Sequence, residues 1–107
     1  MPSTFPETAP VQLTGTEGDI YTVTTAKKAL KIEVWLCNTH TSAVTVTLYL
    51  IPSGGTSSVA NTIYVDSVPA KRSIPITIFC NLSASGKLRG LASTANVVGV
   101  RVAAVEV

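Results

Sequence analysis

The side chains that carry most enzyme chemistry are scarce in this chain. Its 107 residues include one histidine, two cysteines and six Asp or Glu. His40 could join Asp66 in a Ser/His/Asp triad, with Ser42 or Ser53 as the nucleophile. However, neither serine stands in the spacing of a nucleophile elbow. His40 falls in an expected turn, where a solvated imidazole needs no functional explanation, so we expect no catalytic residue and no enzymatic activity.

Metal, phosphate and cofactor sites are expected to be absent as well. One histidine and two cysteines that stand far apart match no zinc spacing, and the acidic residues never gather as in a calcium loop. The run from Ser53 to Gly55 has the glycines of a phosphate loop but lacks its lysine and its following helix. We therefore expect no cofactor.

The two cysteines, Cys37 and Cys80, could form one disulfide. In an extended chain Cys37 is in step with Trp35, whereas Cys80 is in step with Ile78, so the two thiols point to different kinds of face. Two reduced thiols are the favoured interpretation. A bulge could realign them, and the bridge stays an open alternative.

Low charge limits the partners of the protein. Only 13% of the residues are charged, against about 25% in ordinary globular chains. A net charge of +2 neutralises few phosphates, so we expect no nucleic-acid binding. Polar residues interrupt the longest uncharged stretch, from Val34 to Val65, and the N-terminus lacks a basic region followed by an apolar one, so neither a membrane span nor a secretory signal is expected.

Apolar and polar residues alternate with period two from Asp19 onward, which predicts β-strands with one buried face. In the second strand, Leu30, Ile32, Val34 and Leu36 should point inward. We expect this strand and the next to pair as an antiparallel hairpin across the polar turn at 40–43. Pro75 cannot donate to a ladder and places its strand at a sheet edge. The expected strands are Ile20–Thr25, Ala29–Thr39, Val44–Ile51, Thr62–Val65, Ile74–Leu82, Lys87–Ala92 and Val97–Val107.

The fold class that follows is all-β, with very low helix content. Seven to eight short strands separated by turns predict a small antiparallel β-sandwich, jelly-roll-like, over residues 19–107. An immunoglobulin domain is excluded because Trp35 precedes Cys37 instead of lying between two cysteines. Residues 1–18 contain three prolines and no sustained period, and we expect an extended N-terminal arm whose deletion leaves the sandwich folded.

Surface composition points to assembly with other proteins. Faces of Thr, Ala, Val and occasional aromatic residues lose little hydration energy when a neighbour covers them. The outward aromatic residues could instead form the second layer of the sandwich, and the basic residues could simply guard loops and edges. The candidate partner-binding residues are Phe5, Val11 and Leu13 in the arm, the aromatic residues Trp35, Tyr49 and Tyr64, and the basic pair Lys71 and Arg72.

Several runs resemble a known group of proteins. They are VTVTLYLIPSGG at 44–55, Ala60 with Asn61, GLASTANVVGVRVAAVEV at 90–107, DIYTV at 19–23 and the region 36–38. Together they are similar to small virion-associated proteins of tailed bacteriophages and prophages. The likeness covers most of 19–107 and leaves residues 1–18 outside it.

The resemblance implies a non-enzymatic structural protein of the virion, made in the host cytoplasm and often trimeric. The leading expectation is a capsid decoration (cement) protein that binds the major capsid protein of the assembled head. A tail or fibre-associated component is the alternative within this class. A lectin-like module that binds a host surface through Trp35, Tyr49 or Tyr64 is the alternative outside it.

Overall fold

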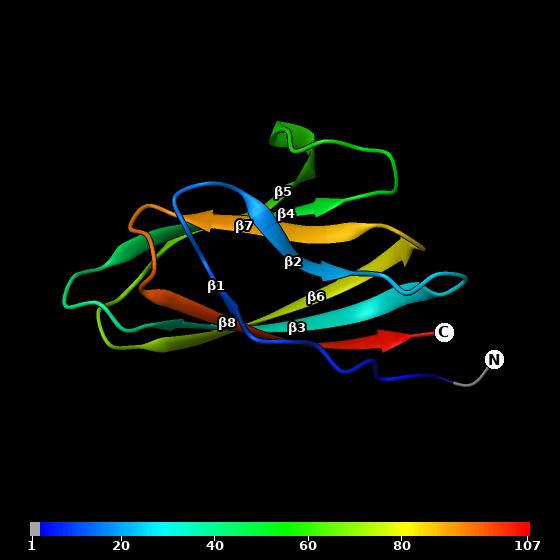
Figure 1. Cartoon of the computed structure of the whole chain (residues 1–107), viewed down its shortest axis with the longest axis horizontal. Helices are drawn as coiled ribbons and strands as arrows, with labels where there is room; N and C mark the ends of the chain where they lie inside the picture. The colour runs from blue at the N-terminus through cyan, green and yellow to red at the C-terminus, as the bar shows by residue number, and fades with distance from the viewer. Residues whose placement is uncertain (1–2) are drawn as a thin grey trace.

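Eight strands form two antiparallel sheets that pack face to face (Figure 1). The computed structural model describes residues 3–107. Sheet A has the order β1-β8-β3-β6 and sheet B the order β2-β7-β4-β5, which is the strand order of a jelly roll. The strands are β1 (Val11–Gln12), β2 (Gly18–Thr22), β3 (Lys28–Asn38), β4 (Val44–Ile51), β5 (Thr62–Val68), β6 (Ser73–Ser83), β7 (Lys87–Ala92) and β8 (Val98–Glu106).

This architecture confirms the predicted all-β, jelly-roll-like sandwich. Within residues 3–107 the helical structure amounts to one short 3₁₀ turn, η1 (Val59–Asn61), which follows the loop after β4. None of the described segments forms a helix with the length and apolarity needed to cross a membrane.

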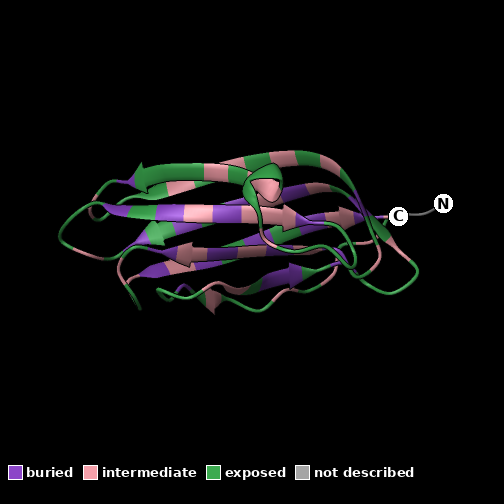
Figure 2. Ribbon diagram, turned by 90° about the horizontal axis from the view of Figure 1, so that it is seen from above, coloured by how far each residue is buried: buried purple, intermediate pink, exposed green. Residues whose placement is uncertain are grey.

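The alternation of side chains builds the core between the sheets. Ile32, Val34 and Leu36 of β3 are fully buried, and they face a similar row on β4 that includes Val46 and Leu48. Buried positions recur along the strands in Figure 2, as a period of two requires. Each such side chain stabilises the fold by about 1.5–3 kcal/mol relative to leaving it exposed.

The expected hairpin of the second and third predicted strands is wrong. β3 lies in sheet A and β4 in sheet B, so the connection between them crosses from one layer to the other. Asn38 holds this crossing: its buried side chain donates through Nδ2 to the carbonyls of Ser42 (3.1 Å), Val68 (3.0 Å) and Pro69 (3.3 Å). Alternation shows which face of a strand is buried. It does not show to which sheet the strand belongs, because the strands of both sheets in a sandwich have one buried face.

A second correction concerns Leu30, which was expected in the core. Its side chain is 39% exposed, and Ala29 is fully buried instead. The register of β3 shifts between Ala29 and Lys31 against both β6 and β8. The irregularity changes the phase of the alternation at this point, as β-bulges do.

The N-terminal segment is part of the sandwich, and the boundary expected after Gly18 does not divide the structure. β1 pairs with β8, and Leu13 is 2% exposed inside the core. Further out, Thr4 forms a bridge with Glu106 near the C-terminus. Met1 and Pro2, which also belong to the expected arm, lie outside the described residues. Because Leu13 fills core volume, we now expect deletion of residues 1–18 to destabilise the sandwich, contrary to the prediction from the sequence.

Candidate interaction surfaces

The outer face of sheet A carries exposed aromatic side chains. Trp35 on β3 is 41% exposed and Phe79 on β6 is 80% exposed. Their cross-strand neighbours are Pro75, opposite Trp35, and Lys31, opposite Phe79. The Lys31 ammonium lies 5.8 Å from the centre of the Phe79 ring, within the range of a cation–π contact. These four residues define what we call the sheet A patch. Lys31 also forms an ion pair with Glu33 (3.0 Å), so a partner that covers the patch would have to accommodate this charged pair.

The outer face of sheet B is more polar near β2 and β7. Arg89 Nε lies 2.7 Å from Asp19 Oδ1, and Arg89 also pairs with Glu17. Lys87 Nζ lies 3.1 Å from the other oxygen of Asp19. This network neutralises its own charges, so covering it would remove hydrated ions from water.

The predicted aromatic set does not gather on one face. Trp35 lies on the outer face of sheet A, and Tyr49 is half-buried on sheet B, where it pairs with Arg89. Tyr64 of β5 packs against the core, and burial, followed by the charge of Asp66, raises the pKa of its hydroxyl. Phe79 is the aromatic residue that joins Trp35 in the sheet A patch. In the sequence, Phe79 alternates with the inward residues Ile74, Ile76 and Ile78, and this pattern already indicated that its side chain points outward.

The three candidates in the arm have different positions. Leu13 is buried in the core, and Val11 packs against the core. Both side chains are therefore used by the sandwich itself. Phe5 remains 75% exposed and borders a shallow cavity of about 230 Å³ that Lys31 and Glu33 also line.

The basic pair lies in the connection between β5 and β6, and both residues are exposed. Lys71 Nζ donates to the carbonyl of Thr39 (2.8 Å), and the carbonyl of Arg72 accepts from the backbone N–H of Asn38 (2.9 Å). These bonds tie the connection to the end of β3. The Lys71 ammonium therefore helps to hold the connection in place and is also exposed to solvent.

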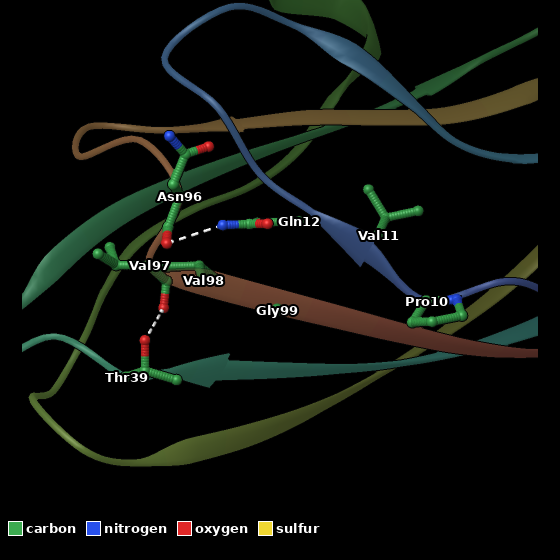
Figure 3. A pocket seen from close by; sticks show the side chains of 8 residues that line it. All are labelled: Pro10, Val11, Gln12, Thr39, Asn96, Val97, Val98 and Gly99. Carbon is green, nitrogen blue, oxygen red and sulfur yellow. Dashed lines mark hydrogen bonds between the residues drawn. The ribbon is translucent and has the colours of Figure 1, made fainter.

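A groove of about 410 Å³ lies beside β1 where this strand meets the start of β8 (Figure 3). Two side-chain hydrogen bonds lie within its lining. Gln12 Nε2 donates to the carbonyl of Asn96 (2.9 Å), and Thr39 Oγ1 donates to that of Val97 (2.7 Å). The lining residues are Pro10, Val11, Gln12, Thr39, Asn96, Val97, Val98 and Gly99, none of which is charged or titratable. The groove therefore offers a ligand no charged anchor.

One carboxylate is buried in the described residues, and the sequence analysis missed it. Glu106 is 1% exposed, and its Oε2 accepts hydrogen bonds from the hydroxyl of Tyr21 and from the backbone N–H of Thr24 (3.1 Å). Burial alone would raise the pKa of Glu106. The bonds from Tyr21 and Thr24, together with the charge of Lys27, outweigh burial and lower it.

The alternation along β8 could have predicted that this carboxylate is buried, because Glu106 follows Val102 and Ala104 on the inward side of the strand. The same residue pairs through its backbone with Thr4, accepting at its carbonyl (2.7 Å) and donating from its N–H (2.9 Å). Glu106 thus joins the arm, β2 and the C-terminal end of β8. The arrangement is that of a structural anchor.

The two titratable residues considered for a catalytic triad lie in different elements of the structure. His40 lies in the β3–β4 connection, where its backbone N–H donates to Asn38 Oδ1 (2.9 Å), and Asp66 lies on β5. Across residues 3–107, no cluster of three or more His, Cys, Asp or Glu could hold a metal ion. Both cysteines are free: Cys37 is exposed on the outer face of sheet A, and Cys80 is half-buried on the inward side of β6.

Comparison with known proteins gives a likeness in fold. No protein-family model matches the chain, and no curated protein does. A solved structure described by the words "Bacillus endospore appendages form a novel family of disulfide-linked pili" is similar over 97% of this chain and 86% of its own. The TM-score is 0.60 and the sequences are 16% identical. The chain therefore shares the β-sandwich fold of that Bacillus structure.

Proposed function

We propose that this chain is a non-enzymatic structural subunit that binds other proteins of a larger surface assembly. The sheet A patch carries the proposal. A Phe that is 80% exposed and a partly exposed Trp on the same sheet face, separated by the Glu33–Thr77 pair, are typical of a protein contact surface. Aromatic residues on a preformed surface lose little conformational entropy on binding and supply much of the energy of natural interfaces.

Within this class, the proposed role is decoration of a phage head. The resemblance to virion-associated proteins favours it, and so does the low charge of the chain. A ligand that binds only the assembled shell stabilises the shell by mass action, by about 2.7 kcal/mol per site when its free concentration is a hundred times Kd. The major capsid protein is the proposed partner, and the virion is the proposed location.

A filament or tail subunit is the second candidate, and the fold match favours it. The words that describe the matching structure concern pili. Jelly-roll subunits serve several kinds of assembly, so the fold is compatible with either role. If the subunits of such a filament were linked by disulfides, the exposed thiol of Cys37 would be the group that forms the link.

Immunogold electron microscopy of particles and cells from the source culture tests both roles. Gold on phage heads supports decoration, gold on tails or on cell-surface filaments supports the second candidate, and particles and filaments without gold refute the proposal. Mass spectrometry of the same purified particles must also find peptides of this chain.

A variant then tests whether the sheet A patch makes the contact. Trp35→Lys should weaken sedimentation of the purified chain with the labelled particle by at least about tenfold, as expected for an aromatic hot spot. Val65→Lys is the matched control, because Val65 is 61% exposed on the other sheet. Equal binding by both variants would remove the patch from the mechanism.

A further inference from the structure

Strand β6 is less protected than the other sheet edges, since Pro75 is the one residue in it that limits pairing. β1 is two residues long, and β2 has a bulge and the ion pairs of Asp19. On β5 the register shifts along the strand, and Asp66 lies on the same side as the buried Val68. β6 extends over eleven residues, SIPITIFCNLS, without one charged side chain. Natural edge strands of this length normally carry charges that prevent pairing with another chain.

The backbone groups on the open side of β6 can be identified from the register. The carbonyl of Arg72 accepts a hydrogen bond from the backbone N–H of Asn38 on β3. The backbone N–H and C=O groups of even-numbered residues at the start of β6 therefore point toward β3. The backbone N–H and C=O groups of odd-numbered residues then point toward the open side of the sheet. This holds up to Phe79, beyond which the register shifts. Pro75 agrees with this parity, because a proline has no N–H to donate and still pairs opposite Trp35. Thr77 and Phe79 therefore present both their N–H and C=O groups at the open edge.

The inward side of β6 is also incompletely covered. Ile74, Ile76 and Ile78 are only half-buried, although they pack against the core. Their partners across the ladder on β3 are fully buried. The difference arises because no strand lies beyond β6 in the described sheet. A strand added at this edge would extend the sheet and cover the isoleucine row.

We infer that β6 is a self-association edge, and that its occupant is β6 of a second copy of this chain, paired antiparallel about a two-fold axis at Ile78. In this register Thr77 exchanges both backbone hydrogen bonds with the partner's Phe79, and the same exchange occurs on the other side of the axis. The Ile78 side chain meets the partner's Ile78 on the inward side. Pro75 lies at the periphery of the pairing, where its missing N–H limits the ladder.

A second copy fits this edge better than a charged partner does. The strand has no charge to attract an acidic or basic segment, and an uncharged strand meets its own copy without repulsion. An isologous contact uses the same surface on both copies and closes after one pairing, so it produces a dimer. This dimer differs from the trimer that the phage resemblance implies. The inference goes beyond the proposed function, because it concerns the free chain in solution and needs no particle.

Sedimentation velocity of the full chain over a dilution series tests the inference, with Thr77→Pro as the variant. Proline at Thr77 removes an N–H from the open edge and, by Pro75's precedent, keeps the bonds to β3. Each backbone bond is worth about fivefold in association, and symmetry removes the bond twice, so the dimer should weaken about 25-fold. Val65→Lys, on the edge strand of the other sheet, should leave the dimer unchanged.

Amide hydrogen exchange of the unmodified chain gives an independent measurement. The N–H groups of Thr77 and Phe79 should become protected as the concentration rises, whereas they should exchange rapidly in dilute solution. A chain that stays monomeric at high concentration overturns the inference. So does an oligomer that forms while these amides stay unprotected, or one that Thr77→Pro leaves intact. A dimer that ignores phage particles would refute the proposed decoration role alone.

Discussion

Removing the Tyr21 hydroxyl tests the buried Glu106 anchor. Tyr21 is 5% exposed and donates to the Glu106 carboxylate, which is 1% exposed. Tyr21→Phe keeps the ring in the core and leaves the backbone N–H of Thr24 as the remaining donor to Oε2 among the described residues. A hydrogen bond to a charged group contributes about 1.5–3 kcal/mol. We expect a loss of about 2 kcal/mol in the free energy of unfolding, or about 10 °C in Tm for a domain of this size.

The pH dependence of this loss identifies its cause. The pKa of Glu106 is held below its ordinary value of 4.5, so the folded state favours the ionised carboxylate. The stabilisation is therefore complete above the ordinary pKa and disappears as the pH falls through the lower pKa of the folded protein. Once Glu106 is protonated, Tyr21 contributes only a neutral hydrogen bond, worth about 1 kcal/mol. The difference between Tyr21→Phe and the unmodified chain should shrink accordingly in acid.

Urea unfolding at neutral pH and at acidic pH measures both effects. Tyr49→Phe is the matched control, because Tyr49 is half-buried and its hydroxyl makes no hydrogen bond within residues 3–107. The control should change stability by less than about 0.5 kcal/mol. The reasoning is refuted if Tyr21→Phe behaves like this control at neutral pH. It is equally refuted if the loss is the same at both pH values.

Three further predictions follow from burial. Leu13→Ala should destabilise the fold by about 2–4 kcal/mol in urea unfolding, because Leu13 is 2% exposed, and a chain lacking residues 1–18 should lose stability for the same reason. A free, loosely attached arm would instead make both changes nearly neutral. Leu36→Ala should cost about 2–5 kcal/mol, whereas Leu30→Ala should cost far less, because only Leu36 is fully buried; equal losses would contradict the bulge. A thiol reagent should label the exposed Cys37 of the native protein quickly and the half-buried Cys80 slowly, since burial raises the pKa of the Cys80 thiol. Equal labelling rates, or an intramolecular disulfide found by mass spectrometry, would contradict the free and unequal thiols of the structure.

Alternation of side chains was enough to predict the strands and the class of fold. Val44–Ile51 and Lys87–Ala92 coincide with the observed strands, and the other main strands differ only at their ends. Pro75 was correctly placed in an edge strand, since a residue without an N–H is tolerated only there. The jelly-roll-like sandwich followed because a chain of this length with one buried face per strand closes a single two-layered core.

Pairing between strands could not be read in the same way. The inward row of β3 would suit either sheet. At the crossing from β3 to β4, the Asn38 amide donates to the carbonyls of Val68 and Pro69, which are distant in the sequence. The phase error at Leu30 has a similar origin, because a bulge exists only relative to neighbouring strands. Both features arise from contacts between segments, and a local period contains no information about them.

For the candidate interaction surfaces, too, the sequence predicted some features and the tertiary structure decided others. By itself the sequence determined which residues alternate, that the chain is poor in charge, and that Trp35 and Phe79 point away from the core. Only the tertiary structure decided that Leu13 belongs to the core, that Tyr49 lies on the opposite sheet from Trp35, and that Glu106 is enclosed by Tyr21 and Thr24. The physical reason is that side-chain direction follows from the local backbone, whereas burial depends on which distant segment covers the side chain.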